Sequence, residues 1–368
     1  MRRDQNANTQ PFLEMPVFQN WDVVARAWYF ACRSKDVRPG KARSLNLCGQ
    51  RVVLFRGDDG RVRALDGFCP HMGTDLGIGT VKGNRIACFF HHWEFDGEGA
   101  CRHVPCGEEA PLNACLQSYA VAEMYDGIWV FPDREPDFPL PEYDGLKGVD
   151  LRVSYGKSYE RTCHHHVTMV NGIDPQHLRT VHDFEIEMDM DVHGGDAPGL
   201  MDYSLVGHLP ERVFKERLIV RLGGNEYGYS MRYSAGTIGL LTMMQRVLLF
   251  GRFPVPALHM IFAYSPISFG RTLTLVQPIY LTRRRRGLWG RCVGRFLLWA
   301  TKRLFHSLRD EDGKVYDNMR FNPAALIKMD RPIALFIKAV NGLTPSMWSG
   351  RGSRRNTGAG GEGGSDTC

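Results

Sequence analysis

The chain has 368 residues, of which 43% are hydrophobic and 23% charged, values that are ordinary for a globular protein with a sizeable core. That length allows two domains, or one large domain with an insertion. The net charge of +6 is too small to argue for a nucleic-acid partner, but it suits docking of an acidic electron-transfer protein. The polar stretch Met1–Phe12 lacks the apolar core of a signal peptide, and no run of about 18 uncharged apolar residues is present. We therefore expect a cytoplasmic protein without a membrane span.

Strand patterns dominate the first third of the chain. An Asp-Gly turn separates the apolar runs 51–56 and 61–65, which is typical of a β-hairpin. A further strand is predicted at 127–131, and the proline-rich stretch 132–141 is typical of a linker between domains. We therefore predict a small all-β domain over residues 20–133.

Strand-like runs continue beyond that stretch, and turn signals separate some of them. They are residues 160–170, 213–222, 227–233, 259–264 and 272–281, with helical patterns at 174–182, 288–308 and 313–319. This order favours an antiparallel sheet with flanking helices over βαβ units, so the predicted fold class is α+β. The predicted organisation is an N-terminal segment (1–19), the all-β domain (20–133), a second domain (134–349) and a disordered Gly/Ser-rich tail (350–368).

The strongest chemical signal is a pair of short motifs in the all-β domain. Cys69-Pro-His71 is followed, after sixteen residues, by Cys88-Phe-Phe-His91. Zinc sites usually pair cysteine with cysteine and histidine with histidine, whereas here each motif supplies one of each. That pairing suits a [2Fe–2S] cluster in which two thiolates hold one iron and two imidazoles hold the other. A chance occurrence of two Cys/His pairs is the alternative, and His92 is an alternative ligand to His91.

The two motifs resemble those of the Rieske domains, over a region from about Trp21 to Asp133. The cluster ligands implied by this resemblance are Cys69, His71, Cys88 and His91. Most Rieske domains have glycine after the second histidine, where this chain has His92.

A second motif distinguishes an enzyme from a simple electron carrier. The spacing Asn-x-x-Asp-x-x-His-x₄-His is formed by Asn171, Asp174, His177 and His182. Five residues of regular helix turn through about 500°, so both histidines bind one metal only if the helix is distorted or ends before the second. By itself such a pair is more often structural. The segment, however, matches the catalytic motif of the Rieske non-haem iron oxygenases, which implies that His177 and His182 ligate a mononuclear Fe(II).

The same resemblance implies a third, carboxylate ligand from a late helix. In that family an aspartate is followed three residues later by Ile or Val and then by an aromatic residue. Asp312, with Val315 and Tyr316, fits this pattern, and Asp310 and Asp317 are the alternatives. Two histidines and one carboxylate leave coordination positions open for O₂ and substrate. The alternative is that the acidic residues between 310 and 317 bind no metal and are simply the solvated start of a helix.

The resemblance gives Asp174 and Asn171 further roles. Asp174 is expected to accept from ring N–H groups of a cluster histidine in one subunit and an iron ligand in the next, and so to form the electron path. An aspartate before Pro175 is equally typical of a helix N-cap, and both roles are compatible. Asn171 either lines the substrate channel or caps a helix. Histidines 164–166 lie in a strand-like run whose alternation sends one or two of them inside.

The implied protein is the oxygenase component of a Rieske oxygenase, a homotrimer with a helix-grip-like catalytic domain. The chain has no flavin or nicotinamide motif, so electrons are expected from a separate flavin reductase, a ferredoxin, or both. The expected reaction is O₂-dependent hydroxylation or N-oxygenation. Oxidative cyclisation or desaturation at the same centres is one alternative, and a Rieske electron carrier without oxygenase activity is another. A zinc-binding module is a third.

The middle of the second domain bears on the substrate. Residues 234–263 are rich in Leu, Met, Phe and Pro, which favours a hydrophobic or aromatic small molecule. A weaker resemblance to aminopyrrolnitrin oxygenase and to the oxygenases and oxidative cyclases of natural-product pathways rests on chain length and on the variant Cys88-x-x-His91-His92-Trp93. The basic, amphipathic segment 283–305 is compatible with peripheral membrane contact, but a packed helix with a solvated basic face is the favoured interpretation.

Overall fold

The computed structural model describes residues 18, 20–182, 187–194, 199–208, 221, 224, 226–250, 252–268 and 271–349. Within them the chain forms two compact units. One is built mainly from Trp21–Leu140, and the other mainly from Pro141–Tyr264 and Leu273–Leu343. The predicted N-terminal segment, apart from Phe18, and the predicted disordered tail lie outside the described residues.

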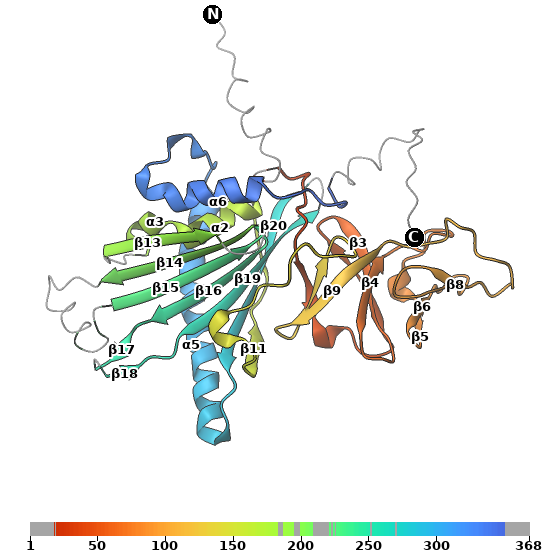
Figure 1. Cartoon of the computed structure of the whole chain (residues 1–368), viewed down its shortest axis with the longest axis horizontal. Helices are drawn as coiled ribbons and strands as arrows, with labels where there is room; N and C mark the ends of the chain where they lie inside the picture. Colours follow the sequence, from red (N-terminus) through yellow and green to blue (C-terminus); the bar gives the residue numbers. More distant parts are fainter. Residues whose placement is uncertain are drawn as a thin grey trace, which may run out of the picture. The chain divides into compact units, whose positions relative to one another are not determined.

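The first unit is all-β, as predicted. Its six-stranded sheet has the order β1-β10-β9-β4-β3-β2 and its four-stranded sheet the order β5-β6-β7-β8 (Figure 1). The strands are β1 Tyr29–Arg33, β2 Ala42–Leu47, β3 Gln50–Arg56, β4 Val62–Asp66, β5 Thr80–Lys82, β6 Arg85–Ala87, β7 Glu94–Phe95, β8 Cys101–His103, β9 Ser118–Met124 and β10 Gly127–Phe131. The predicted hairpin is confirmed, because β3 and β4 pair antiparallel from Val52 with Asp66 to Arg56 with Val62.

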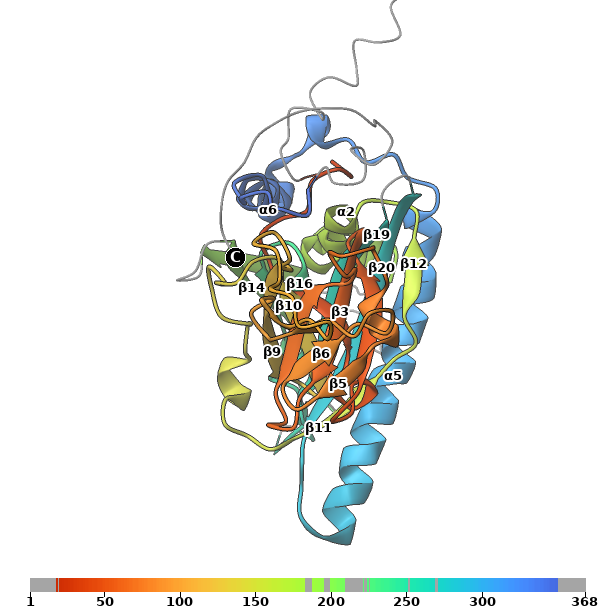
Figure 2. The same ribbon diagram turned by 90° about the vertical axis from the view of Figure 1, so that its right-hand side faces the viewer.

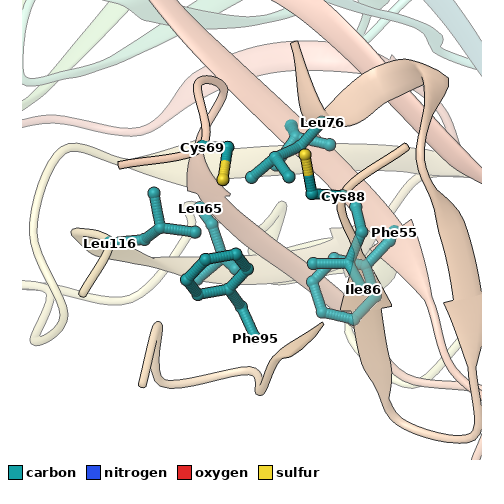
Figure 3. Close-up of a cluster of buried hydrophobic side chains, with 9 residues drawn as sticks. Phe55, Leu65, Cys69, Leu76, Ile86, Cys88, Phe95 and Leu116 are labelled. Atoms are coloured by element: carbon teal, nitrogen blue, oxygen red, sulfur yellow. The ribbon is translucent and has the colours of Figure 1, made fainter. Parts of the chain in front are cut away.

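A buried apolar cluster joins the two sheets of this unit. Phe55 and Leu65 come from the larger sheet, whereas Ile86 and Phe95 come from the smaller one. Figure 3 shows Cys69 and Cys88 within the same cluster, next to Leu76. Burying each large apolar side chain contributes about 1.5–3 kcal/mol to stability, so the two loops that carry the cysteines are fixed to a rigid base.

The second unit is built on an eight-stranded sheet whose described pairs are antiparallel, as predicted. Its order is β11-β20-β19-β16-β15-β14-β13, and β12 also pairs with β20. The strands are β11 Leu151–Tyr155, β12 Tyr159–Arg161, β13 Glu187–Gly194, β14 Leu200–His208, β15 Glu226–Ser234, β16 Ile238–Gln245, β19 Leu258–Ser268 and β20 Arg271–Arg283; β17 Leu248–Leu249 and β18 Phe253–Pro254 form a separate ribbon. The strand predicted at 213–222 lies outside the described residues, except for Arg221.

Helices complete the predicted α+β fold class. They are α2 His165–Val170, α3 Pro175–Thr180, α5 Gly287–Tyr316 and α6 Arg331–Asn341. Helix α5 packs on the sheet through its buried side chains, among them Phe305, whose ring lies 5.3 Å from that of Phe262 in β19 and 6.0 Å from that of Tyr280 in β20. No helix in the described part of the chain is long and apolar enough to cross a membrane.

The strand predicted at 160–170 is wrong beyond its first residues. Strand β12 ends at Arg161, and helix α2 begins at His165. The ring Nδ1 of His164 accepts a hydrogen bond from the amide of His166 at 3.2 Å, which caps the helix in a way that apolar alternation does not indicate. All three histidines are buried, and burial lowers the pKa of His164 to about 3, so this ring is neutral near pH 7.

The separate helix predicted at 313–319 is also wrong, because Gly313 lies inside α5. A Cβ atom at Gly313 would stand 2.9 Å from Nη2 of Arg161. Glycine at this position therefore admits the Arg161 guanidinium, which donates to the carbonyl of Arg309 at 3.1 Å, and it does not end the helix.

Candidate metal centres and the cavity beside them

The Cys/His motifs form two loops with the same hydrogen-bond pattern. The amide of Cys69 donates to the carbonyl of Thr74 at 2.9 Å, and the amide of Cys88 donates to that of Trp93 at the same distance. The carbonyl of Cys69 accepts from Gly73 at 2.9 Å, and that of Cys88 accepts from His92 at 3.0 Å. The motif spacing thus produces two loops with the same hydrogen bonds, and the side chains of the two loops face each other.

The four side chains implied as cluster ligands gather between these loops. Both cysteines are buried, and the rings of His71 and His91 lie with their centroids 4.7 Å apart. The ring of Trp93 stacks on that of His71 at 4.4 Å and fixes its orientation, a contact that the sequence did not suggest. Two buried thiols beside two more exposed imidazoles fit the set of ligands that would hold a [2Fe–2S] cluster of this type.

His92 occupies a backbone conformation that glycine adopts most easily. Its φ is +57°, and Gly73, its counterpart in the first loop, has φ +74°. The side chain of His92 is exposed, whereas His91 lies half-buried beside His71. The positive φ at this position therefore explains why most Rieske domains have glycine here.

The second group of side chains comes from α3, from the residues just after it, and from α5. Ligand atoms of His177, His182 and Asp312 all lie within 4.8 Å of one another. The Nε2 atoms of His177 and His182 are 4.0 Å and 3.1 Å from Oδ1 of Asp312. A cation about 2.1 Å from each ligand keeps neighbouring ligands about 3–4 Å apart, so these distances fit a single metal ion. Among the three acids considered, the structure brings Asp312 to the histidines.

The local chain path explains how both histidines reach this point. Asp174 caps α3 and Pro175 occupies its first turn. The helix ends at Thr180, so His182 leaves the helical spacing and its ring centroid comes to lie 5.1 Å from that of His177. The helix thus ends before His182, which is the condition that the spacing set for both histidines to bind one metal.

Hydrogen bonds to the other ring nitrogens prepare both histidines as ligands. Nδ1 of His177 lies 2.7 Å from the carbonyl of Asp174, and Nδ1 of His182 lies 2.6 Å from Oε2 of Glu311. With Nδ1 donating in each case, Nε2 carries the lone pair that faces Asp312. Burial lowers the pKa of His177, which favours the neutral form that binds a metal.

Asn171 and Asp174 both lie close to the three candidate ligands, but they contact different groups. Asn171 donates from Nδ2 to Oδ1 of Asp312 at 3.0 Å and lines the adjoining cavity. The carboxylate of Asp174 accepts from the amides of Gln176 at 2.8 Å and His177 at 3.4 Å, so the predicted N-cap is confirmed. It is the backbone carbonyl of Asp174, not its carboxylate, that contacts the His177 ring.

An apolar cavity adjoins the three candidate ligands. Alternate residues of β15, β16 and β19 face it: Tyr227, Tyr229, Met231, Tyr233, Leu241, Met243, Met260, Phe262 and Tyr264. The intervening residues, such as Arg232 and Thr242, face a different hollow on the other side of the sheet, as the two-residue period of a strand requires. The hydroxyls of Tyr229 and Tyr316 donate to the carbonyls of Gly172 and Thr168 at 2.7 Å and 2.9 Å. Because these hydroxyls are engaged, the rings of Tyr229 and Tyr316 form the surface that a bound molecule would contact.

Glu311, next to the predicted Asp312, is a residue that sequence reasoning missed. We expect Glu311→Gln to lower the affinity for the mononuclear iron by about 10- to 100-fold, because a neutral amide orients His182 less firmly than a carboxylate does. The measurement is a chelator titration followed by the iron content. Asp310→Asn is the matched control, since Asp310 is exposed and pairs with Arg309 at 2.6 Å. Equal iron retention by both variants would contradict a role for Glu311.

Comparisons with known proteins agree with this geometry. Residues 27–120 match the Rieske [2Fe-2S] domain family. The chain is 27% identical to a cholesterol 7-desaturase of Ciona intestinalis over 87% of this chain and 67% of the relative. It is 37% identical to the oxygenase component of a 3-ketosteroid-9-alpha-monooxygenase of Mycolicibacterium smegmatis, over 33% of this chain and 32% of the relative. The matches thus span about a third to two thirds of these curated relatives' own lengths.

The whole fold has counterparts among solved structures. Dicamba monooxygenase bound to dicamba superposes with a TM-score of 0.62 and 19% identity, covering 86% of this chain and 96% of the other. This likeness is one of fold, and it extends through both units of the chain. The chain therefore contains a Rieske [2Fe-2S] domain and is related in sequence to oxygenase components.

Proposed function

We propose that this chain is a monooxygenase-type oxygenase component that holds a [2Fe–2S] cluster and a mononuclear Fe(II). The proposed cluster ligands are Cys69, His71, Cys88 and His91, and the proposed Fe(II) ligands are His177, His182 and Asp312. The observation that carries the proposal is the approach of the last three side chains to one point beside an apolar cavity. A Rieske electron carrier without oxygenase activity needs neither this group nor the cavity.

Each part of the site has a task in O₂-dependent oxidation. The iron, when bound, supplies O₂ activation at its open positions. Asn171 donates to Asp312 and holds this carboxylate in place, while Glu311 does the same for the His182 ring. The buried aromatic and aliphatic lining excludes water from the space in which a substrate would lie.

The electrons would come from a separate protein, because the chain has no flavin or nicotinamide motif. A flavin reductase, a ferredoxin or both are the proposed partners, and a homotrimer is the proposed assembly. Exposed Met72, Phe89 and Phe90 on the two cluster loops provide apolar contact area for such a partner. We also propose a cytoplasmic location, where Cys69 and Cys88 stay reduced and able to take up iron.

The proposed substrate is a hydrophobic or aromatic small molecule, and hydroxylation or N-oxygenation is the proposed reaction. The cavity presents tyrosine rings, and the hydroxyls of Tyr229 and Tyr316 already donate to backbone carbonyls. The relatives are named for cholesterol, ketosteroid and dicamba, all of which are ring compounds. Desaturation or oxidative cyclisation stays the alternative, favoured by the relative named a desaturase.

Product analysis tests this function. The purified chain, loaded with iron, is mixed with a reductase–ferredoxin pair, NADH, O₂ and a panel of sterols, ketosteroids and aromatic compounds. A product that gains one oxygen atom supports the proposal, whereas one that loses two hydrogens selects the desaturase alternative. An iron content of about two atoms per chain, unchanged in His177→Ala, would identify an electron carrier instead.

Asp174→Asn separates the proposed electron path from the helix cap. An asparagine side chain still accepts from the amides of Gln176 and His177, so we expect both centres and the fold to be retained. Turnover should fall by about 10- to 100-fold, because we propose that the carboxylate accepts from a cluster histidine of the next subunit, while the backbone carbonyl of Asp174 contacts the His177 ring. The measurement is the rate at which the reduced cluster is reoxidised by O₂ in the presence of substrate. An unchanged rate would leave Asp174 with the cap alone.

A further inference from the structure

Helix α5 has two apolar faces, only one of which is covered by the described residues. Among its buried residues, Leu297, Leu298 and Phe305 face the sheet. On the outer side, Leu288 and Trp289 are each 81% exposed, Phe296 is 61% exposed and Trp299 is 58% exposed. The sequence-based expectation was a packed helix with a solvated basic face; the helix is packed on one side, and its outer face carries exposed apolar residues as well as basic ones. Figures 1 and 2 show the N-terminal turns of α5 continuing past the edge of the sheet.

The exposed apolar residues form a stripe along one side of the helix. Leu288, Phe296 and Trp299 are separated by eight and three residues, which brings them onto one face of an α-helix. The stripe runs along the axis for about 16 Å, and the rings of Phe296 and Trp299 contact each other at 5.8 Å. Such a row suits an occupant that covers a length of helix rather than a single pocket.

Arginines lie beside this stripe. Arg285, Arg286, Arg291 and Arg295 are exposed and line one hollow together with Arg152 and Arg284. Among the described residues of that hollow, Asp150 is the one acid, and it pairs with Arg284 at 3.2 Å. From Arg283 to Arg309 the chain contains no aspartate or glutamate. The occupant is therefore expected to be anionic as well as apolar.

We propose that the N-terminal half of α5 docks on an anionic phospholipid surface. Tryptophan is enriched at the membrane–water interface, and arginines beside an apolar stripe are typical of helices that lie in that interface. A two-fold contact between copies of the chain would bring the arginine clusters against each other. A small acidic redox protein would pair with the arginines but would leave much of the apolar stripe exposed. The lipid surface matches both features and goes beyond the proposed oxidation reaction.

Vesicle co-sedimentation tests the docking without any need for turnover. The iron-loaded chain is mixed with vesicles of phosphatidylcholine and phosphatidylglycerol, and separately with vesicles of phosphatidylcholine alone. We expect binding to the anionic vesicles, a weakening by high salt, and a blue shift of tryptophan fluorescence on binding. Arg291→Gln with Arg295→Gln should weaken vesicle binding by on the order of tenfold or more.

Two further variants separate the apolar and the charged contributions. Trp289→Ser with Trp299→Ser should reduce binding and remove the blue shift, while the positive charge is retained. The matched controls are Leu112→Ser, at a fully exposed leucine, and Lys35→Gln with Arg38→Gln, at exposed basic residues far from α5 in the sequence. These controls should bind as the unaltered chain does. The visible spectrum of the cluster and the melting temperature verify that each variant is folded.

Three outcomes would overturn the proposal. One is a chain that does not sediment with anionic vesicles. A second is a pair of α5 variants that bind as well as the controls. The third is a loss of self-association in the α5 variants, measured by light scattering, with no vesicle binding by the unaltered chain; that result would assign the surface to contact between copies.

Discussion

Replacing His182 with alanine is expected to lower the iron content from about three atoms per chain to about two, and to abolish turnover. The Nε2 atom of His182 lies 3.1 Å from Oδ1 of Asp312, in the middle of the group that fits one cation. Loss of a ligand should cost more than the roughly 10- to 100-fold that a change to a neighbouring hydrogen bond costs. Iron analysis and substrate oxidation measure the two effects, while the visible spectrum of the cluster should be unchanged.

The acidic run in α5 provides matched controls for the carboxylate ligand. Asp312→Ala is expected to behave like His182→Ala, whereas Asp310→Ala and Asp317→Ala should retain the iron. Asp310 and Asp317 are exposed, and Asp310 pairs with Arg309, so neither faces the histidines. If Asp310→Ala or Asp317→Ala lost the iron and Asp312→Ala retained it, the proposed ligand set would be wrong.

The order of the elements was accessible from the sequence because it depends on local signals. The hairpin of β3 and β4 follows from alternation and an Asp-Gly turn, and the α3 cap follows from Asp174 before Pro175. The choice of Asp312 over its neighbours was not local, because α5 approaches α3 only in the folded chain. It rested on a family resemblance until the distances to His177 and His182 were known.

The errors share a physical cause. The histidines at 164–166 were assigned to a strand because apolar alternation does not record a side-chain cap, here the one at His164. Gly313 was taken for a helix boundary because its role, admitting Arg161, depends on a residue distant in sequence. Which apolar residues of α5 stay exposed depends on packing too, since the sequence of a helix that is apolar on two sides does not reveal which side is covered.

Separate replacement of each of the two adjacent histidines in the second cluster loop is expected to give opposite results. His91→Ala should remove the visible spectrum of the cluster and about two iron atoms, because the His91 ring lies beside that of His71 between the two loops. His92→Gly should retain the spectrum and stabilise the loop by about 1 kcal/mol, because the residue has φ +57°.

Thermal bleaching of the cluster spectrum is the measurement that compares these variants. His92→Gly should raise the bleaching temperature, and His92→Ala should not, because alanine has a Cβ atom that makes positive φ unfavourable. Retention of the cluster in His91→Ala together with its loss in His92→Gly would reverse the ligand assignment. The equal hydrogen-bond pattern of the two loops argues against that outcome. His92 is the counterpart of Gly73, at the position where each loop turns back, and a glycine supplies no ligand there.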